Sequence, residues 1–207
     1  MNEQLNIILI HGQGRSPWSM KLLGRRLRPY PAHYFGYACW RRSFDEIVAR
    51  FERRLRATVT GKPYLIVAHS LGGIITRATL PKLTDMLPRH LVMLAPPNQP
   101  PSLAKNMQAN WLYRLVTADC GQKLVSTEFY ERLPLPGVPT TIIAGTKGLP
   151  DFLGQFGDKL NDTILAIDET KLDGVEDVRL VPAMHAFIMN RPQVAEIILE
   201  IIDRLVA

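Results

Sequence analysis

The sequence has little cysteine and no long apolar segment. Its 207 residues include two cysteines, Cys39 and Cys120, and neither lies in a spacing typical of a metal site or a redox motif. This excludes a small scaffold built on disulfides, and we expect both thiols to be reduced. No apolar run approaches the roughly 18 residues that a membrane-spanning helix needs. No signal peptide is recognisable, because Met1–Gln4 contains no Lys or Arg and the apolar stretch that follows ends at His11. We therefore expect a cytoplasmic protein.

The charge is distributed unevenly along the chain. The whole chain contains 25 Lys and Arg and 19 Asp and Glu. Residues 1–60 contain 11 of the basic and 4 of the acidic residues, so residues 61–207 contain 14 basic and 15 acidic residues. The net charge of +6 therefore arises in the first third. Such a basic segment occurs in proteins that bind nucleic acids or anionic lipids, and also as a solvated outer surface. We prefer the solvated surface and expect no nucleic-acid partner, with attraction to an anionic membrane or an acidic partner as the alternative.

Strands and helices are predicted to alternate along the chain. Short, continuously apolar runs predict strands at Asn6–Ile10, Pro63–Ala68, Leu91–Ala95, Thr140–Ala144 and Val178–Val181, with a weaker strand at His33–Tyr37. Helical patterns cover Arg15–Leu27, Ser43–Thr58, Gly72–Leu80 and Pro192–Leu205. Trp18, Leu22 and Leu23 share a face of the first, and Ser43 with Glu46 forms a capping box at the second. The alternation predicts a single α/β domain over residues 1–207, with a mostly parallel sheet of about six strands and helices on both faces.

Residues 98–136 lie between two predicted strands and are longer than an ordinary connection. Leu103, Met107, Trp111 and Leu115 follow the spacing of one amphipathic helix, and Lys123–Leu133 forms a second helical stretch. We interpret the segment as a small helical cap over the sheet. The aromatic residues of this cap are Trp111, Tyr113, Phe129 and Tyr130. They either line a ligand pocket or attach the cap to the sheet.

A serine stands where a predicted strand passes into a predicted helix. The sequence there is Ala-His-Ser-Leu-Gly-Gly, residues 68–73. A sharp turn at this position holds a serine on a strained backbone with its hydroxyl above the sheet, and it needs small residues two positions before and after. Ala68 and Gly72 meet that need, so Ser70 is a candidate nucleophile. The alternative is a tight turn with a bystander serine.

Two further segments complete a possible reaction centre. His11-Gly12-Gln13-Gly14 follows the first strand, and the N–H groups of Gln13 and Leu71 are candidate donors to an oxyanion. His185 follows the last strand and is a candidate general base, since a neutral serine hydroxyl is a poor nucleophile. A carboxylate between the strand at Thr140–Ala144 and His185 would orient the imidazole. The residues alone leave six candidates open: Asp151, Asp158, Asp162, Asp168, Asp173 and Asp177.

The chain order Ser, Asp, His is that of the α/β-hydrolase fold. The motif Ala-His-Ser-x-Gly-Gly, with Ala68 in place of the first glycine, resembles minimal bacterial lipases and esterases of that fold. This resemblance covers most of the chain and selects Asp162, because Asn161-Asp162-Thr163 is similar to the Asn-Asp-Gly turn that carries the acid in such lipases. Thr163 departs from that pattern, and Asp158 and then Asp168 are the reserve candidates.

The resemblance implies a serine hydrolase that cleaves carboxylic esters. Because the predicted cap covers part of the site and the chain is too short for a large one, we favour short or medium acyl chains. A thioesterase or an amidase would use the same residues, and a non-catalytic binding module with the basic first third as its working surface is a third interpretation. We expect no cofactor and no metal, since no group of His, Cys, Asp and Glu has the spacing of metal ligands.

Overall fold

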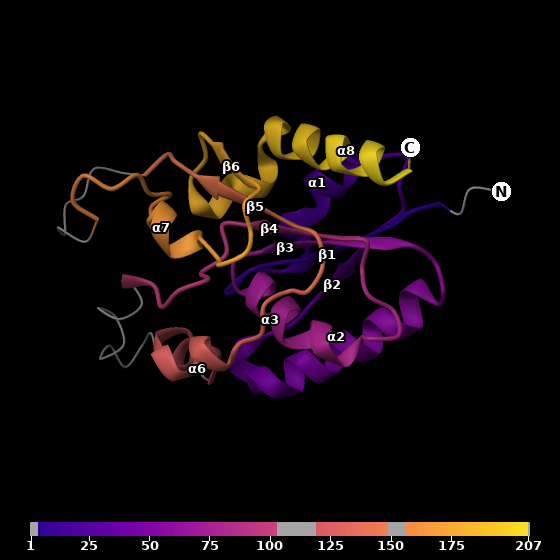
Figure 1. Ribbon diagram of the computed structural model, residues 1–207, viewed down its shortest axis with the longest axis horizontal. Coiled ribbons are helices and arrows are strands. Elements are labelled where there is room, and N and C mark those ends of the chain that lie inside the picture. Colours follow the sequence, from indigo (N-terminus) through magenta and orange to yellow (C-terminus); the bar gives the residue numbers. More distant parts are fainter. Residues whose placement is uncertain (1–3, 103–118, 149–155, 207) are drawn as a thin grey trace.

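Six parallel strands form one sheet at the centre of the protein (Figure 1). The computed structural model describes residues 4–102, 119–148 and 156–206. The strands are β1 (Asn6–Ile10), β2 (Ala32–Phe35), β3 (Tyr64–His69), β4 (His90–Leu94), β5 (Thr140–Gly145) and β6 (Val178–Val181). They lie in the order β2-β1-β3-β4-β5-β6, and every neighbouring pair is parallel. This confirms the predicted α/β architecture with a parallel sheet of six strands. The weak strand is shorter than predicted and forms one edge of the sheet.

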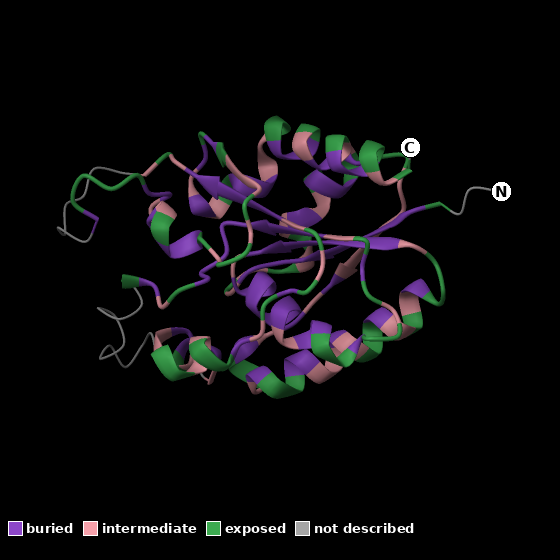
Figure 2. Ribbon diagram, in the orientation of Figure 1, coloured by how far each residue is buried: buried purple, intermediate pink, exposed green. Residues whose placement is uncertain are grey.

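Helices cover both faces of the sheet. The α-helices are α1 (Lys21–Arg26), α2 (Phe44–Val59), α3 (Leu71–Thr79), α6 (Thr127–Arg132), α7 (Ile167–Thr170) and α8 (Pro192–Val206). The 3-10 helices are η1 (Pro17–Met20), η2 (Cys39–Arg41), η3 (Leu80–Lys82) and η4 (His185–Asn190). In Figure 1, α2 and α3 lie on one face, and α1 and α8 lie on the other. Figure 2 shows that the central strands of the sheet between them are buried, whereas the edge strands β2 and β6 are only partly buried. The predicted capping box of α2 is present, because Ser43 and Glu46 each accept a backbone N–H of the other.

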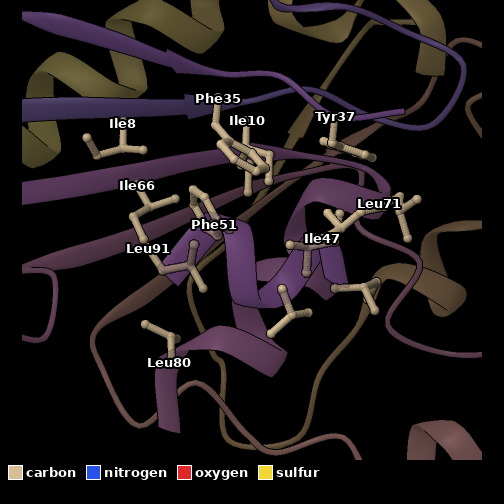
Figure 3. Close-up of a cluster of buried hydrophobic side chains, with 14 of the residues drawn as sticks. Ile8, Ile10, Phe35, Tyr37, Ile47, Phe51, Ile66, Leu71, Leu80 and Leu91 are labelled. Atoms are coloured by element: carbon tan, nitrogen blue, oxygen red, sulfur yellow. The ribbon is translucent and has the colours of Figure 1, made fainter. Parts of the chain in front are cut away.

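Alternate residues of each strand enter different cores. Ile8 and Ile10 of β1 pack with α2 and α3 (Figure 3), whereas Ile7 and Leu9 pack with α1 and α8. Successive side chains of a strand point to opposite faces, so a strand covered on both faces must be apolar throughout. This is why the central strands β1, β3, β4 and β5 appear in the sequence as largely apolar runs.

The first predicted helix differs from the expectation. Residues 15–27 form η1 followed by α1, and the buried positions are Met20, Leu23 and Leu27. Trp18 is 71% exposed and Leu22 is 41% exposed. The face shared by Trp18 and Leu22 therefore points to solvent rather than to the sheet.

The described part of the 98–136 insertion packs beside α2. Residues 119–125 are helical, Ser126 interrupts the helix, and the Ser126 hydroxyl then caps α6 by accepting the Phe129 N–H. The Phe129 ring meets the Phe44 ring of α2 edge to face, with centroids 5.2 Å apart. For Phe129 this favours attachment over lining a pocket. The predicted helix through Leu103 and Leu115, with Trp111 and Tyr113, lies outside the described residues.

Across the described ranges, no helix is both long enough and apolar enough to cross a bilayer.

Candidate active site

Ser70 occupies a strained turn between β3 and α3. Its backbone angles are φ 52° and ψ −123°, a conformation that costs a residue with a side chain about 1–3 kcal/mol. Two hydrogen bonds hold the turn: the Ser70 N–H donates to the Leu94 carbonyl at 2.9 Å, and the Gly73 N–H donates to the Ser70 carbonyl at 2.9 Å. The serine is therefore fixed by β4 on one side and by the first turn of α3 on the other.

Glycine is required where α3 begins, because the helix approaches β1 closely. A Cβ atom on Gly72 would lie 2.8 Å from the His11 carbonyl oxygen and 3.0 Å from that of Ile10. These neighbours are backbone atoms that cannot move aside. The small residue predicted at position 72 thus lets the serine turn lie directly against the end of β1.

His185 and Asp162 lie next to Ser70, although they come from distant parts of the chain. The Nε2 atom of His185 is 2.9 Å from the Ser70 Oγ, and its Nδ1 atom is 2.7 Å from an Asp162 carboxylate oxygen. The His185 N–H also donates to the Asp162 main-chain carbonyl at 2.7 Å. Asp162 is 1% exposed and His185 is 8% exposed. The three side chains form one continuous hydrogen-bonded chain from carboxylate to hydroxyl.

The Asp162 carboxylate is held by its own turn. The oxygen that does not meet His185 accepts the Ile164 N–H at 3.0 Å and the Leu165 N–H at 2.8 Å. Thr163, which stands where the resemblance places glycine, has φ 89°. The turn therefore has the positive φ typical of glycine, although its residue is a threonine.

The two reserve candidates for the carboxylate lie elsewhere. Asp158 is exposed, and Asp168 is exposed and pairs with Lys171 at 2.9 Å. The structure brings neither of them to His185.

The loop after β1 passes beside the serine. A Cβ atom on Gly12 would lie 3.0 Å from the Ser70 Cβ and 2.7 Å from the His69 Nδ1, so only glycine permits this approach. Gln13 follows directly, and Leu71 is the first residue of α3, where backbone N–H groups have no acceptor within the helix. Both N–H groups predicted as oxyanion donors thus belong to segments that border Ser70.

His11 braces this loop through a partner that sequence reasoning missed. Its ring stacks on the Tyr37 ring with centroids 4.4 Å apart, and the Tyr37 hydroxyl donates to the His11 carbonyl at 2.9 Å. Burial lowers the pKa of His11, so the ring stays neutral. Its Nδ1–H can then donate to the Gly12 carbonyl at 2.8 Å while Nε2 accepts the Tyr37 N–H at 3.3 Å. No pattern in the sequence connects Tyr37 to His11.

His69 supports the base rather than the serine. Its Nε2 atom is 3.1 Å from the His185 carbonyl oxygen, and the two rings are tilted with centroids 5.1 Å apart. Burial, and after it the nearby His185, lowers the pKa of His69 well below its usual value. A neutral His69 therefore adds a hydrogen bond to the backbone of His185 without adding a competing positive charge.

Most of the chain matches the model of a known protein family. The alpha/beta hydrolase family matches residues 7–163 of the chain. The chain belongs to the alpha/beta hydrolase family. The matched part of this hydrolase includes Ser70 and Asp162 and ends before His185.

Solved structures with the same fold include lipases and thioesterases. The mature Bacillus licheniformis lipase BlEst2 has a TM-score of 0.74 at 16% identity, covering 100% of this hydrolase and 93% of that chain. Human thioesterase 2 has a TM-score of 0.61 at 13% identity, covering 98% and 96%. Phospholipase PlaB from Legionella pneumophila has a TM-score of 0.65 at 17% identity, covering 81% and 44%, so this hydrolase spans less than half of PlaB. No curated protein sequence matches the chain. These likenesses show the fold.

Proposed function

We propose that the protein is a serine hydrolase that cleaves carboxylic esters through an acyl-enzyme intermediate. The observation that carries the proposal is the pair of contacts at His185, 2.9 Å to the Ser70 hydroxyl and 2.7 Å to the Asp162 carboxylate. A histidine that contacts a hydroxyl through one nitrogen and a carboxylate through the other can remove a proton from the first while the second stabilises the resulting charge.

Acylation begins with proton transfer from the Ser70 hydroxyl to the Nε2 atom of His185. The serine oxygen attacks the ester carbonyl carbon, and the carbonyl oxygen takes up the electron pair as an oxyanion. The N–H groups of Gln13 and Leu71 hold that oxyanion, and such donors stabilise the transition state by about 3–4 kcal/mol each. The tetrahedral intermediate then collapses, His185 gives its proton to the leaving alkoxide, and the alcohol departs.

Deacylation repeats these steps with water as the nucleophile. His185 takes a proton from water, the hydroxide attacks the acyl-enzyme, and the same N–H groups hold the second oxyanion. Collapse breaks the bond to Ser70, and His185 returns the proton to the serine oxygen. The carboxylic acid leaves, so one water is consumed for each ester cleaved.

Labelling with a fluorophosphonate tests the proposed nucleophile. The reagent reacts with a serine hydroxyl that is activated by a base, so we expect the wild-type protein to be labelled at Ser70 and Ser70→Ala to remain unlabelled. Ser102 has a hydroxyl that donates to Glu169 at 2.6 Å, outside the proposed triad, and Ser102→Ala should be labelled like the wild type. Folded wild-type protein that does not react would refute the proposal.

Thioester cleavage is the second candidate, because human thioesterase 2 shares this fold at a TM-score of 0.61. A series of p-nitrophenyl esters and acyl-thioesters of matched chain length separates the two candidates. We expect kcat/KM to be larger for the esters and to be highest for short or medium acyl chains. A consistent preference for thioesters would favour the second candidate and leave the proposed triad unchanged.

A further inference from the structure

Among the residues that the structure describes, three large aromatic side chains are exposed to solvent, and each has a cation over its ring. Trp18 is 71% exposed, Trp40 is 61% exposed and Phe187 is 53% exposed. Burying such rings usually stabilises a protein, so three exposed rings in one region indicate a surface that meets a partner. The pairs are Lys21 over Trp18 at 3.3 Å, Arg41 over Trp40 at 4.2 Å and Arg15 over Phe187 at 5.8 Å. We call these six residues the aromatic–basic surface.

The three pairs come from neighbouring segments at the end of the sheet where the parallel strands have their carboxyl ends. Trp18 lies in η1 after β1, Trp40 in η2 after β2, and Phe187 in η4 after β6. The η1 segment packs against both η4 and β2, and the Arg15 guanidinium donates to the Ala186 carbonyl at 2.6 Å. All three segments follow the carboxyl ends of parallel strands, which is also where Ser70 follows β3. The aromatic–basic surface therefore lies on the same edge of the sheet as the proposed active site.

The segment that contains five of these six residues, between Glu3 and Asp45, is positively charged. Between Glu3 and Asp45 the sequence contains seven Lys and Arg and no Asp or Glu. Arg42 is exposed beside the surface, and it lines one hollow with Arg15 and Arg41. Within the described ranges, the ion pairs involve other cations, so these arginines keep their charge available to a partner.

We propose that the aromatic–basic surface docks the protein on an anionic lipid bilayer. Tryptophan rings are stable at the level of lipid headgroups, because an indole is apolar with one polar N–H. Arginine and lysine are attracted to the negative surface potential of anionic lipids. An acidic protein would match the charge, but the three exposed rings favour a bilayer interface. Docking in this way turns the edge that carries Ser70 toward the lipid. The inference goes beyond the proposed function, because it concerns binding and needs no turnover.

Vesicle co-sedimentation of the Ser70→Ala protein tests the docking without catalysis. We expect it to bind phosphatidylcholine vesicles that contain phosphatidylglycerol, to bind pure phosphatidylcholine weakly, and to dissociate at high salt. Arg41→Gln with Arg42→Gln should lower the partition coefficient about 25-fold, since each basic residue near an anionic surface contributes about fivefold. Trp18→Ala with Trp40→Ala should lower it about tenfold through lost insertion at the interface.

The matched control is Arg89→Gln with Arg204→Gln, two exposed arginines at the opposite edge of the sheet, before β4 and at the end of α8. This pair removes the same charge and should leave the partition coefficient within about twofold, because screening confines the attraction to the contacting face. An equal loss in the control would overturn the proposal, as would tighter binding to duplex DNA or polyglutamate than to the anionic vesicles. Thermal melting shows that each variant is folded. Fluorophosphonate labelling of wild-type protein tests the proposed function separately.

Discussion

At the scale of single residues, Asp162 joins a turn to the proposed base. One carboxylate oxygen accepts two backbone N–H groups of its own turn, and the other lies 2.7 Å from His185. The Asp162 carbonyl also accepts the His185 N–H. The side chain and the backbone of Asp162 thus act on the same histidine, so the imidazole has little freedom to rotate away from Ser70.

Replacing this carboxylate should remove activity without unfolding the protein. Asp162→Asn keeps the size and one acceptor oxygen, but its NH₂ group cannot accept the His185 Nδ1–H. We expect kcat for a p-nitrophenyl ester to fall about 10⁴-fold, because the wrong tautomer of the base is then favoured. Asp158→Asn and Asp168→Asn are the controls and should stay within about twofold of the wild type, as is usual for exposed carboxylates. If one control lost activity while Asp162→Asn remained active, the carboxylate that orients His185 would be that control residue and not Asp162.

Thr163 carries strain that a glycine would release. Its φ of 89° is unfavourable for a β-branched side chain. Thr163→Gly should raise the free energy of unfolding by about 1 kcal/mol, since relief of about 1–3 kcal/mol of strain exceeds the entropy that glycine adds to the unfolded chain. Urea denaturation measures the change.

The control is Thr58→Gly in α2, where the same substitution should instead destabilise the protein by about 0.3–0.5 kcal/mol, since glycine is less favourable than threonine in a helix. Destabilisation by both substitutions would mean that Thr163 is not strained. Activity of Thr163→Gly should stay near the wild type, because the hydrogen bonds to Asp162 come from backbone N–H groups.

At the scale of elements, a buried arginine attaches the 98–136 insertion to helix α3. Arg77 of α3 is 2% exposed and donates to the Leu133 carbonyl, the Pro134 carbonyl and the Asn98 side-chain oxygen at 3.0–3.1 Å. Asn98 in turn donates to the Thr170 carbonyl at 2.8 Å. Burial lowers the pKa of Arg77 to about 10. One side chain thus reaches both ends of the insertion and, through Asn98, the end of α7.

Removing this guanidinium should destabilise the protein strongly. Arg77→Leu leaves buried acceptors at Leu133, Pro134 and Asn98 without a donor, and we expect a loss of about 3 kcal/mol in the free energy of unfolding. Arg77→Lys should recover only part of it, because an ammonium group does not have the planar fork of a guanidinium. The matched control is Arg132→Leu, an exposed arginine paired with Glu128, which should change stability by less than about 0.5 kcal/mol. Similar losses in both variants, measured by urea denaturation, would contradict the proposed role of Arg77.

The sequence predicted most elements, and the exceptions have physical causes. Buried strands such as Asn6–Ile10 are recognisable because both faces of the sheet are covered. Ser70 and His185 were predicted to meet, because each follows a parallel strand and such ends share one edge. The choice of Asp162 needed the resemblance, because residue type and spacing do not distinguish a catalytic aspartate from the surface aspartates near it in the sequence. The exposure of Trp18 and the contacts of Arg77 depend on which distant segments cover them, and local periodicity contains no information on that.

At the scale of the whole molecule, buried histidines link stability to pH. Burial lowers the pKa values of the buried His11 and His69, and partial burial lowers that of His90, from the usual 6.5. Below pH 6.5 the unfolded chain therefore binds protons that the folded protein does not. Because the unfolded state binds more protons, the free energy of unfolding must fall as the pH decreases below this value.

We therefore expect the melting temperature to decrease from about pH 7.5 to about pH 5.5. Over this range the free energy of unfolding should fall with a slope approaching about 1.4 kcal/mol per pH unit for each fully buried histidine. His90→Gln should flatten this dependence, since it removes one titrating group, whose Nε2 lies 2.9 Å from the Thr141 hydroxyl, far from Ser70. The matched control is Asp168→Asn. Its carboxylate has a pKa lowered by the Lys171 hydrogen bond, so its effect belongs below about pH 4 and should leave the histidine range unchanged. A melting temperature that is constant or increases as the pH falls through 6.5 would mean that these histidines are protonated in the folded protein.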